Sequence, residues 1–310
     1  MATVDLELQI ASQAKQIVLI ASILLIILVI TSVLLRDRVP KLKTWLFGMI
    51  STTLLIPTLF IIVNTIRINV QSESGGPAHW HAGVEFWVCG AELELRNPTG
   101  LLSNKIGTST YHEHDDKFIH LEGVVMRRQH DASLGKFMSV TGGYLNKAGM
   151  GIPLNSDESN WFASNDKLDG DHQYIENFTL ATAAGDRISH NQDGPVINLK
   201  NGEYCSSDTE ESAELQTFVY TFNKANNTYS QHKLASSGDA ANYAIREESS
   251  LGPPSDCIIF EFDKPKDRTD KLCEQYGVRD KDRCIEFGVK PENKSAVCDI
   301  KEVTVGSNNG

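Results

Sequence analysis

The chain has 310 residues and a formal net charge of −11, and its long apolar segments gather at the N-terminus. Residues 1–66 carry five basic and three acidic side chains, so the rest of the chain carries a net charge of −13. An acidic surface repels phosphate backbones, so this composition argues against nucleic acid as a partner. The about 240 residues that follow are enough to bury a core.

Two apolar segments predict transmembrane helices. They span residues 17–35 and 45–66, and the second contains Pro57. At about 1.5 Å per residue, a helix of this length crosses a hydrocarbon core of about 30 Å, and a membrane helix tolerates an internal proline. A cleaved signal peptide is the alternative for the first segment, but no small-residue cleavage site follows it. We therefore expect residues 1–66 to form a transmembrane helical hairpin in the lipid bilayer.

The short loop between the two segments predicts the orientation. Its sequence, RDRVPKLK, holds four basic residues and one acid. The positive-inside rule places such a loop in the cytoplasm, so both termini and the large domain are expected outside it, in a two-pass protein of the cell membrane. All six cysteines follow residue 66, which agrees with an oxidising compartment. Polar residues in the helices, such as Asn64, would allow a homo-oligomer or packing against subunits of a membrane complex.

The residues after a short linker at 67–78 predict a β-rich domain over 79–263. Residues 79–88, HWHAGVEFWV, alternate partly between polar and apolar, and a turn at Cys89-Gly90 would join them to AELELR in a hairpin. Further strands are predicted at 117–127, 216–222 and 256–262, and a short helix at 133–138. Residues 144–215 give no readable pattern. The expected architecture is a sandwich or barrel-like domain with few helices.

The tail, residues 264–310, is highly charged and contains three of the six cysteines. We expect a small appendage stapled by a disulfide. Cys273 and Cys284 enclose a short polar loop and are the candidate pair, although six cysteines allow fifteen pairings. No close C-x-x-C pair is present, which argues against a cysteine-based zinc site.

Five of the nine histidines fall in a short stretch and form a candidate metal site. They occur as two H-x-H pairs and one H-x-E pair, and on a strand residues i and i+2 point to the same face. Imidazole and carboxylate groups suit copper or zinc. The predicted ligands are His79, His81, His112, His114 and His120, with Asp115 or Glu122 as a further ligand or as a partner that orients an imidazole. Solvated surface histidines are the alternative interpretation.

The sequences YHEHDDKFIHLEG, residues 111–123, and SLGKFMSVTGG, residues 133–143, resemble a group of uncharacterised exported or membrane-anchored prokaryotic proteins. Their pattern is an early H-x-H, then L-H-T-H-D, I-H-I-E and T-L-G-x-F-F. This chain departs from it at Tyr111 and Glu113, and Gly83 stands where a third early histidine is common. The resemblance covers roughly residues 79–143 and implies a small β-rich module with a metal site. It implies no particular activity.

Three function classes follow from these features. The leading hypothesis is a membrane-tethered, extracytoplasmic copper- or zinc-binding protein in metal acquisition or delivery. The first alternative is a structural or adhesive surface protein, or an accessory subunit of a membrane complex, with a structural metal. The second is a metalloenzyme with a nearby carboxylate as general base, although no H-E-x-x-H, G-x-S-x-G or P-loop motif occurs.

Overall fold

The computed structural model describes most of the chain, in two compact units, Met1–Pro77 and Ala78–Gly310. The described residues are 6–35, 42–98, 104–155, 188–191, 194–205, 212–223, 228–247, 256–279, 285–286, 296–297 and 300–302.

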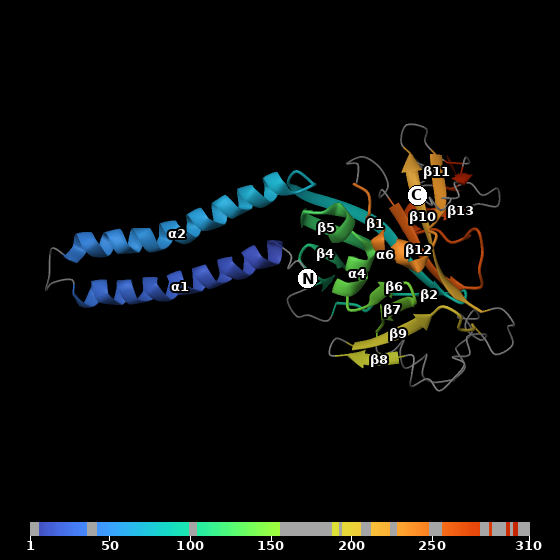
Figure 1. The fold of residues 1–310 in the computed structure, drawn as a ribbon, viewed down its shortest axis with the longest axis horizontal. Coiled ribbons are helices and arrows are strands. Elements are labelled where there is room, and N and C mark those ends of the chain that lie inside the picture. Colours follow the sequence, from blue (N-terminus) through green and yellow to red (C-terminus); the bar gives the residue numbers. More distant parts are fainter. Residues whose placement is uncertain are drawn as a thin grey trace. The chain divides into compact units, whose positions relative to one another are not determined.

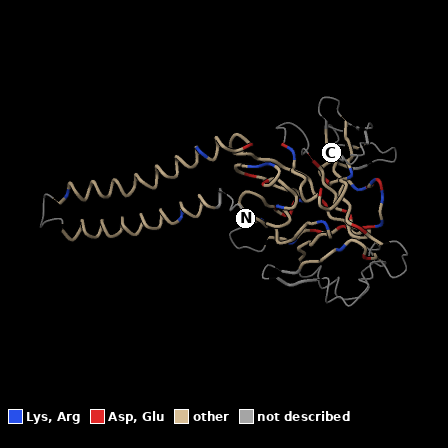
Figure 2. Tube along the Cα trace, viewed as in Figure 1, with Lys and Arg blue, Asp and Glu red and all other residues tan. Residues whose placement is uncertain are grey.

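The first unit contains the two long apolar helices that the sequence predicts. They are α1 (Leu6–Leu34) and α2 (Leu42–Gln71), which pack against each other as a hairpin (Figure 1). By length and composition, both are able to cross a membrane. Few charged residues lie along them (Figure 2). Both helices extend beyond the apolar segments, because the flanking residues are mostly good helix formers. The linker is therefore shorter than the predicted range 67–78 and contains only the residues between α2 and the first strand.

The second unit is mostly β with few helices, as predicted. Its main sheet has nine strands in the order β16-β11-β10-β12-β1-β5-β4-β3, with β2 also paired to β1. The bounds are β1 (Pro77–Val88), β2 (Ala91–Leu93), β3 (Ile106–Gly107), β4 (Tyr111–Glu113), β5 (Phe118–Val124), β10 (Glu214–Asn223), β11 (Thr228–Lys233), β12 (Asp256–Asp263) and β16 (Ile300–Glu302).

Two smaller sheets and four short helices complete the described part of this unit. One sheet contains β6 (Tyr144–Asn146), β7 (Gly149–Pro153), β9 (Gly194–Lys200) and β8 (Ile188–Asn191), and the other contains β13 (Val278–Arg279), β14 (Ile285–Glu286) and β15 (Ala296–Val297). The helices are α3 (Arg128–Asp131), α4 (Leu134–Val140), α6 (Ser237–Asn242) and the 3-10 helix η2 (Glu274–Tyr276). Among the described residues, no sheet closes on itself.

The predicted hairpin and the other predicted elements are present. Strands β1 and β2 pair antiparallel around Cys89 and Gly90, whose φ angles of 53° and 87° suit a tight primed turn. The strands expected at 117–127, 216–222 and 256–262 correspond to β5, β10 and β12, and the short helix expected at 133–138 corresponds to α4.

Alternating side chains of β1 build the larger core. Trp80, Ala82, Val84 and Phe86 are buried together with apolar residues of β5 and α4. Strand β12 runs parallel to β1, and the rings of Phe86 and Phe260 stack at 5.2 Å. Burying a large apolar side chain contributes about 1.5–3 kcal/mol, so this face holds the sheet together.

A second apolar cluster covers the other face of β10 and β12. Phe218, Tyr220 and Ile259 pack there with Tyr276 from the tail. Because residues alternate along a strand, these side chains lie opposite to those of the larger core. The tail therefore packs on the sheet, and its strand β16 pairs in parallel with β11.

The predicted Cys273–Cys284 disulfide is wrong. Cys273 is bonded to Cys257, and Cys89 to Cys205. Cys257 is buried on β12, and the tail returns over this strand to bring Cys273 beside it. Cys284 lies outside the described residues. No described cysteine is free.

Candidate metal centre

Three neighbouring strands bring the predicted histidines together. Strands β1, β5 and β4 are adjacent in the main sheet, and His112 lies directly opposite His120 in the β4–β5 register. The i, i+2 spacing puts His79 and His81 on one face of β1. The intervening residues on β1 and β5 point into the larger core, which fixes the direction of the histidines.

The histidines form two groups that could each hold a metal ion. One consists of His79, His81 and His120, and the other of His112, His114 and His120. Within each group the ligand atoms lie within 4.8 Å of one another. His120 belongs to both groups, and its ring lies 4.8 Å from that of His81 and 4.7 Å from that of His114. The groups are therefore parts of one continuous centre.

Two nitrogens of the second group converge closely. The Nε2 atoms of His112 and His114 are 3.1 Å apart. The Nδ1 atom of His114 lies 2.8 Å from the carbonyl oxygen of Asn104. A carbonyl only accepts, so the proton sits on Nδ1 and the lone pair of Nε2 faces the centre. Two imidazoles on a tetrahedral zinc at about 2.0–2.1 Å place their nitrogens about 3.3 Å apart, close to this arrangement.

The buried imidazoles favour the neutral form that binds metals. His112 is fully buried, and burial, with the nearby Lys105 and His114, lowers its pKa to about 4. Burial also lowers the pKa of His120, against the opposing effect of Asp116. Both rings therefore keep a lone pair available at neutral pH, which a metal ligand requires.

Two carboxylates contact these histidines. The Oδ2 atom of Asp116 lies 2.9 Å from Nε2 of His120. The Oε1 atom of Glu122 lies 3.2 Å from Nε2 of His79, and its Oε2 atom lies 3.9 Å from Nε2 of His112. Carboxylates that hold ligand imidazoles fix the ring orientation and the tautomer. The prediction that Glu122 stands beside the histidines agrees with this geometry.

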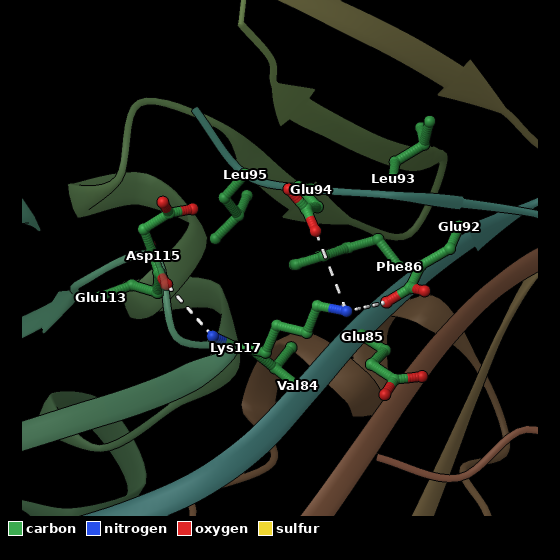
Figure 3. Close-up of a pocket in the computed structure, with 10 residues that line it drawn as sticks. All are labelled: Val84, Glu85, Phe86, Glu92, Leu93, Glu94, Leu95, Glu113, Asp115 and Lys117. Carbon is green, nitrogen blue, oxygen red and sulfur yellow. Dashed lines mark hydrogen bonds and ion pairs between the residues drawn. The ribbon is translucent and has the colours of Figure 1, made fainter. Parts of the chain in front are cut away.

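Asp115, which we expected as a ligand or orienting residue, belongs to neither group. Its backbone has a left-handed φ of 67°, and it lines a pocket together with Glu113 and Lys117 (Figure 3). The next residue, Asp116, makes the carboxylate contact to His120 instead. The adjacent acidic pair in the sequence was the signal for this contact, but the conformation of the turn decides which member makes it.

The side chain of Glu113 supports this turn from the opposite side of β4. Figure 3 shows it in the acidic pocket around Lys117, whose Nζ lies 2.9 Å from Glu92 and 3.8 Å from Glu94. The Oε1 atom of Glu113 accepts the N–H groups of Asp116 at 2.7 Å and Lys117 at 3.3 Å. Burial raises the pKa of Glu113 to about 7. Glu113 thus holds the loop that presents Asp116 to His120.

A larger side chain would be crowded at Gly83, the next position on the histidine face of β1. A Cβ atom at Gly83 would meet Sγ of Cys273 at 3.0 Å and Oε1 of Gln275 at 3.1 Å. The tail and its disulfide thus occupy the space that a larger side chain would need. In this chain the histidine face of β1 ends at His81.

Comparison of the chain with family models, curated proteins and solved structures finds no match.

Proposed function

We propose that this chain is a membrane-tethered, extracytoplasmic protein that binds copper or zinc through its histidine centre and serves in metal acquisition or delivery. The convergence of His112 and His114, with Nε2 atoms 3.1 Å apart beside His120, carries the proposal. Burial keeps the His112 ring neutral, and a backbone carbonyl orients the His114 ring before any ion arrives. Such preorganisation reduces the cost of assembling the ligands.

The donor set favours copper or zinc over hard cations. Imidazole nitrogens dominate both groups, whereas calcium and magnesium prefer shells of oxygen ligands. Thiolates are excluded for the four described cysteines because all four form disulfides. The expected site is therefore a nitrogen-rich one with carboxylate support.

The two helices support anchoring in a membrane. Six of their polar side chains donate to the carbonyl oxygen four residues earlier, so these groups need no water: Ser22, Thr31, Thr52, Thr53, Thr58 and Asn64. The core of a bilayer offers no water, so a polar side chain with an internal partner costs less there than an unpaired one. The basic loop between the helices and the disulfides of the second unit favour placing that unit outside the cytoplasm.

The exposure of one ligand favours exchange of the ion over a closed structural site. The side chain of His79 is 64% exposed, whereas that of His112 is completely buried. Structural zinc sites are closed by their protein ligands. A centre with one accessible side allows an ion to enter and leave, as acquisition or delivery requires.

The test is the metal content of the full-length chain, purified in detergent with its disulfides formed, after exposure to copper or zinc and dialysis against a chelator. We expect bound copper or zinc in the wild type. His120→Ala removes the residue common to both groups and should weaken binding at least tenfold. His130→Ala is the matched control, because this half-exposed histidine belongs to neither group. A wild-type chain that takes up neither ion would overturn the proposal.

A further inference from the structure

The centre offers more ligands than one ion uses. Five histidines and Glu122 supply six side chains, while zinc in proteins is almost always held by four ligands. Among the described residues, there are two groups of three histidines whose ligand atoms lie within 4.8 Å of one another. The groups differ in environment, since one includes the exposed His79 and the other the buried His112.

Glu122 stands between the two groups. Its Oε1 atom faces His79 of the first group at 3.2 Å, and its Oε2 atom is 3.9 Å from His112 of the second. Each carboxylate oxygen thus lies beside a ligand of a different group. A carboxylate that gives one oxygen to each of two ions suits the separation of about 3.5–4 Å found in two-metal sites.

We propose that the centre binds two transition-metal ions, one at each histidine group, with the Glu122 carboxylate bridging them. This inference rests on the proposed function and adds the number of ions and their bridging ligand. The inner ion is held by His112 and His114, and the outer ion by His79 and His81.

His120 completes the shell of one ion and does not bridge. The acceptor Asp116 lies 2.9 Å from its Nε2 atom, so the proton sits on Nε2 and Nδ1 keeps the lone pair. A histidine bridges two ions only when both ring nitrogens are free of protons. The bridge therefore falls to Glu122. The ion without His120 then has three protein ligands, two histidines and Glu122, which leaves room for a water molecule or an incoming ligand.

The number of ions is measured by loading the metal-free, full-length chain with copper(II) and counting bound copper by mass spectrometry. We expect two ions per chain in the wild type and in the control His130→Ala. His79→Ala/His81→Ala and His112→Ala/His114→Ala should each retain one. Because the wild-type count alone tests the stoichiometry, the result does not depend on how the variants fold.

Electron paramagnetic resonance tests the bridge. Two copper(II) ions joined by a carboxylate couple magnetically, so the spin count of the wild type should fall below its copper content. In Glu122→Gln the coupling should disappear and the spin count should rise to match the bound copper. Two ions with unchanged coupling in Glu122→Gln would overturn the bridging role.

The outcomes separate this inference from the proposed function. One ion per wild-type chain would overturn the two-ion centre and leave metal binding intact. No bound ion would overturn both.

Discussion

One face of strand β1 is open near its start and covered toward its end. In the open half, His79 and His81 face other histidines, and neither apolar cluster of the described residues includes them. In the covered half, Gly83, Glu85 and Trp87 lie beneath the tail. The same two-residue alternation therefore places candidate ligands at the start of the strand and packing residues where the tail lies over it.

Three contacts hold the tail to the covered half. The N–H of Glu274 donates to Oε1 of Glu85 at 2.8 Å, and Nζ of Lys271 lies 4.4 Å from the ring centroid of Trp87. The disulfide between Cys257 and Cys273 fixes the same segment. If the two halves are independent, damage to the covered half should cost stability without loss of metal.

The largest expected effect comes from removing that disulfide. Cys257 and Cys273 are separated by 16 residues, and closing a loop of this length stabilises a fold by about 3 kcal/mol. Cys257→Ser/Cys273→Ser should lower the free energy of unfolding by about this amount, measured by denaturant unfolding with tryptophan fluorescence. The metal content of the folded variant should match that of the wild type. Loss of metal together with stability would show that the two halves are coupled.

The second prediction concerns the effect of Glu113, which supports the turn beside the open half, on the pH dependence of stability. Burial raises the pKa of Glu113 from 4.5 to about 7, so its contribution to stability is complete below pH 4.5 and is lost as the pH rises through about 7. Glu113→Gln removes this dependence. In metal-free protein the variant should gain about 2–3 kcal/mol relative to wild type between pH 4.5 and pH 8.

Unfolding of wild type and Glu113→Gln at the two pH values measures this difference. The pKa of His112 is lowered to about 4, so this residue destabilises the fold as the pH falls below 6.5, but it is present in both proteins and cancels. A constant difference between the two proteins across this range would contradict the raised pKa.

The third prediction places a histidine at position 83. Gly83→His would press against Cys273 and Gln275, so we expect a loss of about 1–2 kcal/mol in the free energy of unfolding. The reduced freedom of the unfolded chain offsets part of this cost. The number of bound ions should not increase, because the tail covers this position. A variant of wild-type stability that binds an additional ion would show that the boundary between the halves lies elsewhere.

The smallest expected effect distinguishes the contributions of Asp115 and Asp116 to metal affinity. Asp116→Asn removes the charged acceptor of the His120 ring and should weaken metal binding about tenfold, or about 1.4 kcal/mol. Asp115→Asn is the matched control, since Asp115 lies outside both histidine groups, and should leave the affinity unchanged. Competition with a coloured chelator measures both. Equal effects of the two substitutions would indicate that metal binding depends on the negative charge near the centre. They would argue against a role of Asp116 in orienting the His120 ring.

The sequence predicts the parts of the centre that lie on long strands. The alternation in β1 and β5 indicates both the strands and the shared face of their histidines. Strand β4 has only three residues, too few for a periodic pattern, and its register with β5 depends on the turn between them. Strands β6 to β9 fall within 144–215, where no pattern was readable. The partner of Cys273 is likewise not readable from the sequence, because Cys257 lies on β12 and the pairing depends on the path of the tail over the sheet.

The other disulfide has a consequence for the integrity of the centre. Cys89 and Cys205 are 116 residues apart, and the ligands from His112 to Glu122 lie between them in the chain. A single cut by a protease anywhere in this interval would leave two fragments joined by a covalent bond. A cleaved chain would then retain all its histidines in one molecule, and only reduction would release them. Wherever a protease reaches the chain, this bond would thus guard against loss of the candidate ligands.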